Sequence, residues 1–417
     1  MRISTPQFYG SSLTGILNQQ NTLNTLSQQL ATGSRIVNPS DAPVAVAQNA
    51  ALNGQIERLG TYTQNAQYAQ GALQLESKTL QSVGTLIDQV RQLAVQMNNA
   101  TVNAQDLRNA AAAMKGYVEQ LAQYANTQDG QGNYIFAGSK SDAMPFVLEA
   151  DGRVRYLGDG GQNQLALGPS LSAAISDAGD GIFLSARAAN GQFTVSSNPA
   201  NSGSATAGPG TVNDRALADQ LLLVNGTQYQ ISFSGSGSGT TYTITSGTGG
   251  VFSPTPMASG SYTEGMSLGL PPGGSPAITV PILGTPANGD QFTVQAASPQ
   301  GLFETFQSLA AALTATDTSP GTNARRAQAI SNALASLDQN QTRLLDTQAT
   351  IGARLQQVQA VQAQNTSLTV RLQTEQSELT QINYPEVITR YQQSLTALQA
   401  AQKAFMQLQG MNLFQYL

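Results

Sequence analysis

Histidine, cysteine and tryptophan are all absent from the 417 residues of this chain. Without histidine or cysteine there can be no Ser-His-Asp triad, no thiol nucleophile, no disulfide, and no imidazole- or thiolate-bound zinc, copper or haem. Carboxylates remain as candidate ligands for magnesium or calcium, but no Asp/Glu cluster has the loop spacing of a dedicated site. The commonest general acid–base residue is also missing. We therefore predict no enzymatic activity, no cofactor and no metal site.

Charged side chains are scarce as well, at 10 % of the chain against the usual quarter. The 19 lysines and arginines are scattered and the net charge is −5, so no basic surface for nucleic acid is indicated. No run of about 18 apolar residues offers a membrane span. The first residues, MRISTPQFYGSSLTG, lack the apolar region of a secretory signal peptide. We predict neither a nucleic-acid partner nor a membrane partner.

Glycine and proline are unevenly distributed along the chain. Residues 130–301 hold 29 of the 40 glycines and 12 of the 17 prolines, which excludes long helices there. The flanking regions are rich in Ala, Gln and Leu with helical periodicity. A chain of this length is long enough for two to four domains. The middle region is therefore predicted to be inserted between two helical arms.

Apolar side chains recur every seven residues at both ends of the chain. Such a stripe must be buried against another helix, and isolated helices of about three heptads are marginal in water. The terminal helices therefore either pair with each other or bind neighbouring subunits. An exposed apolar tail at 413–417 also invites a partner. The predicted interface residues are Ile16, Leu23, Leu26, Leu30, Ile388, Tyr391, Leu395, Leu398, Phe405, Leu408, Leu413 and Phe414.

The two arms carry longer heptad columns. One arm has Leu73, Leu80, Ile87 and Ala94 on one column and Val83, Val90 and Met97 on the next; the other has Ile330, Leu337, Leu344, Ile351, Val358, Asn365, Leu372 and Leu379. A helix over 330–383 would be about 80 Å long. Asn365 either sets the register of the apolar column or faces solvent where the helix drifts. Tyr384-Pro385 should interrupt the helix and start another over 386–409.

The middle region has the pattern of short strands separated by Gly, Asn and Asp. The predicted strands are 146–148, 154–157, 193–195, 229–233, 242–244 and 292–294. Two similar Gln-Phe-Thr-Val segments, at 192–195 and 291–294, bracket an apparent insertion. The GSGSGT segment at 235–240 lacks the lysine of a phosphate-binding loop, so we interpret it as a hairpin.

These patterns predict an α+β protein, an elongated rod of long N- and C-terminal α-helices with a β-rich region inserted between them. We expect four parts: terminal coiled-coil helices and loop at 1–45 and 384–417; a long helical rod domain at 46–138 and 302–383; a β-rich domain at 139–190 and 289–301; and an inserted Gly/Thr-rich β domain at 191–288.

Three segments together resemble flagellar axial proteins, the family of flagellins and hook-associated proteins. They are GSRIVNPSDAPVAVA at 33–47, GNYIFAGSKSDAMPF at 132–146, and the tail TALQAAQKAFMQLQGMNLFQYL at 396–417. The resemblance covers about residues 1–185 and 289–417. The insertion near 190–289 and Pro385 depart from the family pattern, which leaves the role of the outer domain and the continuity of the last helix open.

The resemblance implies an extracellular structural protein of the bacterial flagellum, exported by the flagellar type III apparatus. It implies a homo-oligomeric ring between hook-associated protein 1 and flagellin, and an export chaperone that holds the C-terminal helix beforehand. Arg35 and Asp41, in the first of these segments, are candidates for a contact between subunits, with a local salt bridge or plain exposure as the alternative. Two rival functions are a flagellin of the filament and an adhesin-like surface protein with the β insertion as its binding head.

Overall fold

The computed structural model describes residues 5–99, 102–149 and 152–413. The chain forms two compact units, the first from Met1–Asn65 with Ala360–Leu417 and the second from Ala66–Gln359. Long helices make up both ends of the chain and strands fill its middle, which confirms the predicted α+β class. Among the described residues, no helix combines the length and apolar character needed to cross a membrane.

Eight α-helices are described, separated by short 3-10 and π turns. The α-helices are α1 (Thr5–Thr32), α2 (Pro43–Met97), α3 (Ala104–Ala125), α4 (Gly179–Phe183), α5 (Arg215–Ala218), α6 (Leu302–Thr314), α7 (Pro320–Thr380) and α8 (Tyr384–Leu413); the short turns are η1 (Pro39–Asp41), η2 (Asp219–Val224) and η3 (Gly237–Gly239). Pro43 and Pro320 each occupy the first position of a long helix, where the missing N–H costs nothing.

Fourteen strands are described between α3 and α6. They are β1 (Phe146–Leu148), β2 (Val154–Tyr156), β3 (Gln164–Gly168), β4 (Leu171–Ala174), β5 (Phe193–Ser197), β6 (Thr206–Ala207), β7 (Thr211–Val212), β8 (Thr227–Ser234), β9 (Thr241–Thr248), β10 (Val251–Phe252), β11 (Ala258–Ser261), β12 (Ser267–Leu270), β13 (Ile278–Leu283) and β14 (Gln291–Ala296). All six strands expected from the sequence are present, and the GSGSGT segment connects the antiparallel strands β8 and β9.

In the second unit, α2 and α7 bury their heptad columns. The fully buried members are Leu73, Leu80, Ile87 and Ala94 from α2 and Ile330, Leu337, Ile351 and Val358 from α7. Arg91 of α2 pairs with Asp338 of α7 at 2.5 Å and donates to Gln341 at 2.8 Å. The seven-residue period therefore predicts correctly which side of each helix is buried.

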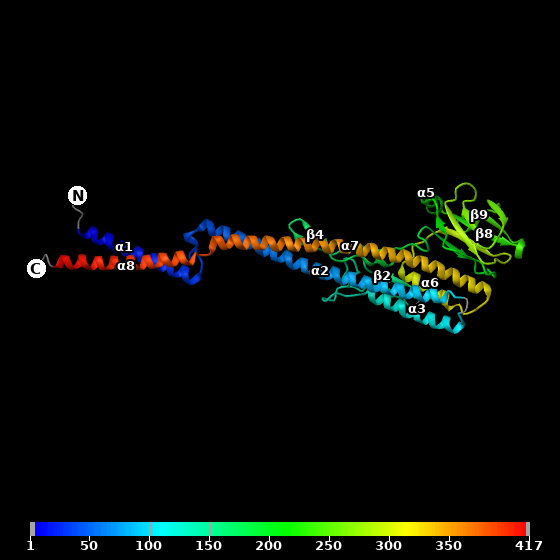
Figure 1. Ribbon diagram of the computed structural model, residues 1–417, viewed down its shortest axis with the longest axis horizontal. Coiled ribbons are helices and arrows are strands. Elements are labelled where there is room, and N and C mark those ends of the chain that lie inside the picture. The colour runs from blue at the N-terminus through cyan, green and yellow to red at the C-terminus, as the bar shows by residue number, and fades with distance from the viewer. Residues whose placement is uncertain (1–4, 100–101, 150–151, 414–417) are drawn as a thin grey trace. The chain divides into compact units, whose positions relative to one another are not determined.

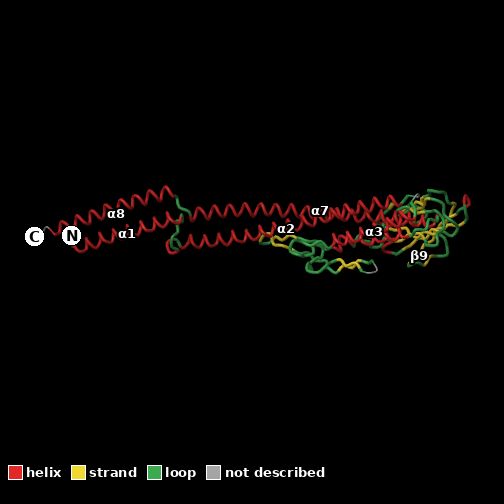
Figure 2. Tube along the Cα trace, turned by 90° about the horizontal axis from the view of Figure 1, so that it is seen from below, coloured by secondary structure: helices red, strands yellow, loops and turns green. Residues whose placement is uncertain are grey.

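Helices α3 and α6 complete the helical part of the second unit and pack against each other. Helix α3 begins with a capping box, in which the Asn103 side chain accepts from the N–H of Asp106 and the Asp106 carboxylate accepts from the N–H of Asn103. Its buried face presents Leu107, Met114 and Leu121. Figure 2 shows α3 running along α2 in this unit.

The GNYIFAG segment provides an aromatic anchor for the loops that follow α3. Phe136 is fully buried and meets Phe183 edge to face, with ring centroids 5.2 Å apart. Phe183 also lies near Phe146 and Phe303, so the aromatic cluster joins the loops, strand β1 and helix α6. Gly138 has a positive φ of 71°, and a Cβ there would meet the backbone of Asp159. Only glycine fits this turn without strain.

Residues 193–296 form a β domain with its own apolar core. One antiparallel sheet has the order β10-β9-β8-β14-β5, with β11 also on β9, and a second sheet holds β12, β13, β6 and β7. Strand β14 lies between β5 and β8, with Val294 opposite both Val195 and Tyr229. Phe292 and Val294 are fully buried in this core. The sequence-based division separated 289–301 from 191–288, whereas the structure places β14 inside the β domain.

A ladder of polar side chains on α7 attaches the β domain to the helices. Its four members are Gln328, Asn332, Ser336 and Asn340, spaced four residues apart along the helix, and the first two of them bond to the β domain. Gln328 accepts from the N–H of Ala207 at 2.6 Å, and its Nε2 donates to the carbonyl of Val195. Asn332 donates to the same carbonyl at 2.9 Å. Helix α7 thereby bonds to β5 at Val195 and to β6 at Ala207, and Figure 1 shows the β domain, labelled at β8 and β9, beside the N-terminal end of α7.

Candidate assembly interface

In the first unit, α1 and α8 run side by side in opposite directions (Figure 2). Tyr9 meets Phe405 edge to face with centroids 6.1 Å apart, and further along the pair Gln19 donates to Ser394. Of the two alternatives left open by the sequence, the terminal helices therefore pair with each other within one chain. This pairing divides the predicted apolar residues into two groups.

The first group faces the partner helix and forms the α1–α8 seam. Leu23 is 8 % exposed and Leu398 is 9 % exposed. The remaining seam members are partly buried, namely Ile16, Leu26 and Leu30 from α1 and Tyr391 and Phe405 from α8. At 100° per residue, Tyr391 and Phe405 lie within about 20° of Leu398 around the helix. This heptad column of α8 is therefore covered by α1 of the same chain.

The second group stays open to solvent on one side of the pair. Ile388 is 43 % exposed and Leu395 is 39 % exposed, and both lie about 60–80° around α8 from Leu398. Met406 shares that angle, and Leu13 and Leu17 lie about 60–100° around α1 from Ile16. Because the helices are antiparallel, the same sense of rotation brings both sets to one side. We call this surface, made of Leu13, Leu17, Ile388, Leu395 and Met406, the open flank.

Charge contributes little to this surface. Arg390 and Glu386, one turn apart on α8, form a largely exposed ion pair at 2.7 Å, but they lie about 80–120° around the helix from Leu398 in the sense opposite to the open flank. Such a pair adds only a few tenths of a kcal/mol to the helix. The chemistry that the open flank offers is therefore burial of aliphatic side chains, with about 1.5–3 kcal/mol available for each one that is fully covered.

A backbone joint connects the terminal pair to the helices that follow. The N–H of Arg35 donates to the carbonyl of Thr380 at 2.7 Å, and Ser34 forms a β-bridge with Gln381. Gly33 adopts a positive φ of 70°, and a Cβ there would lie 2.9 Å from the hydroxyl of Tyr384. The two linkers, far apart in sequence, are thus held together by main-chain hydrogen bonds. The predicted helix break before Pro385 is present, since α7 ends at Thr380 and α8 begins at Tyr384.

The loop candidates from the sequence have different surroundings. The guanidinium of Arg35 donates to the carbonyl of Leu379 at 3.0 Å, so it contacts the C-terminal end of α7 while remaining exposed. A cation is favourable at that end of a helix. Asp41 closes the short turn η1, and its side chain lies outside the described part of the structure, as do those of Leu408 and Leu413. Phe414 lies wholly outside the described residues.

Asn365 occupies its heptad position in the first unit and is only 7 % exposed. The alternative that it faces solvent is therefore wrong, and its burial agrees with a role in register. Nearby, Leu52, Leu59 and Leu372 form a small apolar cluster between α2 and α7. Sequence reasoning missed Gln19 and Ser394, because polar residues inside an apolar stripe look like interruptions until both helices are placed.

Residues 3–141 match the bacterial flagellin N-terminal helical region. Flagellar hook-associated protein 3 of Escherichia coli strain K12 is 34 % identical over 183 residues, which are 44 % of this chain and 57 % of that protein. The match thus spans a little over half the length of the curated relative.

Solved structures extend the likeness over most of the chain. The crystal structure of flagellar hook-associated protein 3 from Legionella pneumophila matches with a TM-score of 0.71 and 26 % identity, covering 79 % of this chain and 98 % of that chain. The chain resembles flagellar hook-associated protein 3. A crystal structure described as the flagellar junction protein from the same organism matches with a TM-score of 0.67 and 26 % identity, covering 80 % of this chain and 99 % of its own.

The likeness to hook-associated protein 3 confirms the resemblance inferred from the three sequence segments. About a fifth of this chain lies outside the match with the first Legionella structure. The arrangement of helical ends around a β-rich middle is common to the chain and to that protein.

Proposed function

We propose that this chain is a non-catalytic structural protein of the bacterial flagellum, a ring-forming subunit at the junction between hook and filament. Its neighbours would be further copies of itself, hook-associated protein 1 on the hook side and flagellin on the filament side. It would reach the cell exterior through the flagellar type III apparatus, with a chaperone covering α8 before export.

The open flank carries this proposal. An apolar surface that persists after α1 and α8 have paired has no covering partner among the described residues of its own chain, and contiguous exposed apolar surface marks interaction sites. Because the chain resembles hook-associated protein 3, we propose that another flagellar axial subunit covers the open flank. In a closed ring the same contact recurs at every subunit, so a small change per contact is multiplied around the ring.

Electron microscopy of a strain that lacks this chain tests the position in the flagellum. We expect complete hooks without filaments, together with flagellin released into the medium. Normal filaments in that strain would contradict the junction assignment. Loss of adhesion with intact filaments would instead favour the adhesin function. Filaments in wild-type cells that consist mainly of this chain would favour flagellin.

Two double variants then separate the open flank from the seam. Ile388→Ser with Leu395→Ser changes exposed positions, so we expect a helical, monomeric protein that is exported and fails to restore filaments. Leu398→Asp with Phe405→Asp places charges against α1, so we expect loss of helical signal in the isolated protein as well. Thr389→Ser with Thr396→Ser, on another face of α8, is the control. Full filaments from the Ile388/Leu395 variant would show that the open flank is not an assembly surface.

A further inference from the structure

Glu76 occupies an apolar position of the α2 heptad pattern. Stepping back by seven from Met97, Val90 and Val83 leads to Glu76, on the column that faces the interior of the second unit. Its neighbours on the column, Val83 and Val90, are fully buried. A carboxylic acid therefore stands where the pattern calls for an aliphatic side chain.

The burial of Glu76 is complete, with 0 % of the residue exposed. Neither carboxyl oxygen has a hydrogen-bond partner among the described residues. An ionised carboxylate in such surroundings is costly, because it gives up hydration without gaining a donor. Desolvation, with a smaller contribution from the charge of Asp177, raises the pKa of Glu76 to about 8, against weaker opposing effects of Arg354 and of the backbone N–H of Asp177.

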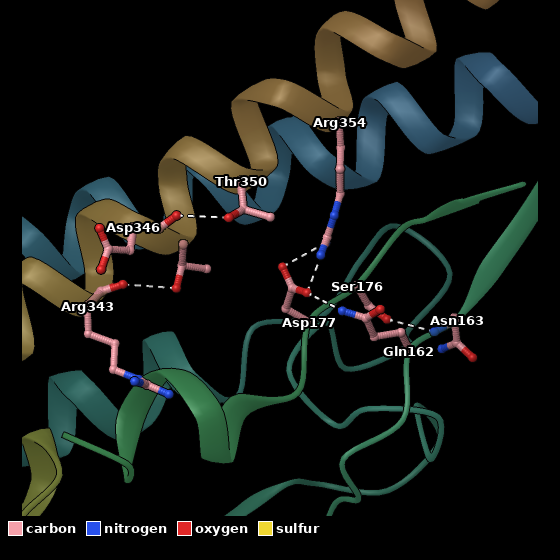
Figure 3. Close-up of polar contacts among 9 residues, drawn as sticks. Gln162, Asn163, Ser176, Asp177, Arg343, Asp346, Thr350 and Arg354 are labelled. Atoms are coloured by element: carbon pink, nitrogen blue, oxygen red, sulfur yellow. Dashed lines mark hydrogen bonds and ion pairs between the residues drawn. The ribbon is translucent and has the colours of Figure 1, made fainter.

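Two charged groups face Glu76 from the other elements packed around it. Arg354 comes from α7, and Asp177 comes from the loop between β4 and α4. The two pair with each other, the Arg354 guanidinium donating to both carboxylate oxygens of Asp177 at 2.8 and 2.9 Å. Gln162 donates to the same carboxylate at 2.6 Å. Figure 3 shows the guanidinium and the carboxylate pointing at each other between helix and loop.

The cluster therefore contains two acids and one base. Both members of the ion pair are largely buried, with 20 % of the Arg354 side chain and 12 % of the Asp177 side chain exposed. While Glu76 is protonated and neutral, the guanidinium of Arg354 forms an ion pair with Asp177 only. Once Glu76 loses its proton, two carboxylates compete for one guanidinium, and a buried charge without a partner is strongly destabilising.

We propose that Glu76, Asp177 and Arg354 form a proton-dependent latch that holds the loop at 175–184 against helices α2 and α7. A proton on Glu76 keeps the Asp177–Arg354 pair intact and the loop closed. When Glu76 loses that proton, its carboxylate competes with Asp177 for Arg354. The loop then separates from the helices, which exposes Glu76 to water. This device is independent of the assembly surface on α1 and α8.

The direction of the pH dependence follows from linkage. In the open loop Glu76 regains its ordinary pKa near 4.5, below its value in the closed form. Closing the loop therefore takes up a proton in the window between the two values. Opening becomes easier as the pH rises through this window, by at most about tenfold per pH unit, and levels off above about pH 8.

Hydrogen–deuterium exchange of the full-length protein tests the latch. Peptides from 162–184 are followed from about pH 5.5 to about pH 8.5, with exchange corrected for its intrinsic pH dependence. We expect protection in the wild-type protein to fall at least tenfold between about pH 5.5 and about pH 7.5 and to level off only above about pH 8. Constant protection across this range in the folded protein would overturn the proposal.

Two variants and a control distinguish the latch from general loosening. Glu76→Gln should remove the pH dependence. Asp177→Asn frees Arg354 for Glu76, so protection should level off at a lower pH than in the wild type. Glu119→Gln, an exposed change on α3, should behave as the wild type. A Glu76→Gln protein with the wild-type pH profile would assign the titration to another group, and so would an unshifted profile in Asp177→Asn.

Discussion

Gln19 of α1 donates from its side-chain amide to the hydroxyl of Ser394 on α8 over 2.6 Å and to the Ser394 carbonyl over 3.1 Å. These residues are 375 positions apart, and Ser394 is buried. One polar pair inside an otherwise apolar seam fixes how far one helix can slide along the other, because any shift leaves a donor or an acceptor without its partner.

The Gln19–Ser394 pair should show measurable coupling. We expect Gln19→Ala and Ser394→Ala each to lower the unfolding free energy by about 1 kcal/mol, and the double variant to lose less than the sum, with a coupling of about 0.5–1.5 kcal/mol. Urea unfolding followed by circular dichroism gives the four values of the cycle. Gln20→Ala, at an exposed position, is the control. Strict additivity would show that the two side chains act independently.

Two glycines in the same unit should respond in opposite directions to alanine. Gly33→Ala forces an L side chain into a positive φ and toward the Tyr384 hydroxyl, so we expect a loss of about 1 kcal/mol or more. Gly15 lies within α1 with open space where its Cβ would be, so Gly15→Ala should gain about 0.5–1 kcal/mol through helix propensity. Thermal unfolding of both variants measures the contrast. Equal shifts would mean that the joint does not strain the backbone at Gly33.

Removal of the whole β domain should leave the helical part of the second unit folded. The N–H of Ala297 already donates to the carbonyl of Gln192 at 2.9 Å, so a short Gly-Ser turn can replace 193–296. The apolar core of the domain lies entirely within that range. We expect a soluble variant with an unchanged helical content per helical residue, measured by circular dichroism.

A narrower deletion of 196–288 is the matched comparison. It keeps residues 193–195 of β5 and all of β14 but removes β8 and most of the core, which exposes Phe193 and Phe292. We expect this variant to aggregate, because large apolar side chains that were fully buried become solvent-exposed. If the narrower deletion remains monomeric in light scattering while the wider one aggregates, the domain boundary lies elsewhere than the strand pairing indicates.

The burial of Glu76 should make global stability depend on pH. Its pKa is about 8 in the folded protein and near 4.5 when unfolded, so folding takes up a proton between these values. The stabilisation is complete below about pH 4.5 and is lost as the pH rises toward 8. At pH 7 the loss amounts to about 3 kcal/mol. Urea titrations at several pH values should show that the unfolding free energy of Glu76→Gln increases relative to that of the wild type as the pH rises through this window. A pH-independent difference between the two free energies would contradict the linkage.

The α7 column illustrates what the sequence could predict. A seven-residue apolar repeat has one physical cause, burial of one helix face, so Leu337, Ile351 and Val358 were assignable without a structure. The same holds for the strands, whose alternation and glycine boundaries are local. Pro385 likewise marked the start of α8, because proline restricts the residue before it.

The open flank and the Glu76 cluster could not be predicted in the same way. Ile388 and Tyr391 carry the same heptad signal, and only the placement of α1 determines which of them is covered. Asp177 reaches Arg354 across 177 residues of sequence, through loops whose path depends on the aromatic anchor at Phe136. The role of polar residues such as Gln328 can be recognised only once the backbone groups to which they hydrogen-bond have been placed. Which side chains meet at these sites therefore depends on the tertiary arrangement, which local sequence patterns do not determine.

The polar ladder on α7 has a consequence for how this chain can evolve. Gln328 and Asn332 bind main-chain groups of Val195 and Ala207, and every residue except proline offers the same N–H and C=O. The helix therefore recognises the presence of an extended backbone and not the identity of its side chains. Substitutions, and even exchange of one β insertion for another, can accumulate beyond these strands without compensating changes in α7. The helical part can stay constant while the outer domain diversifies.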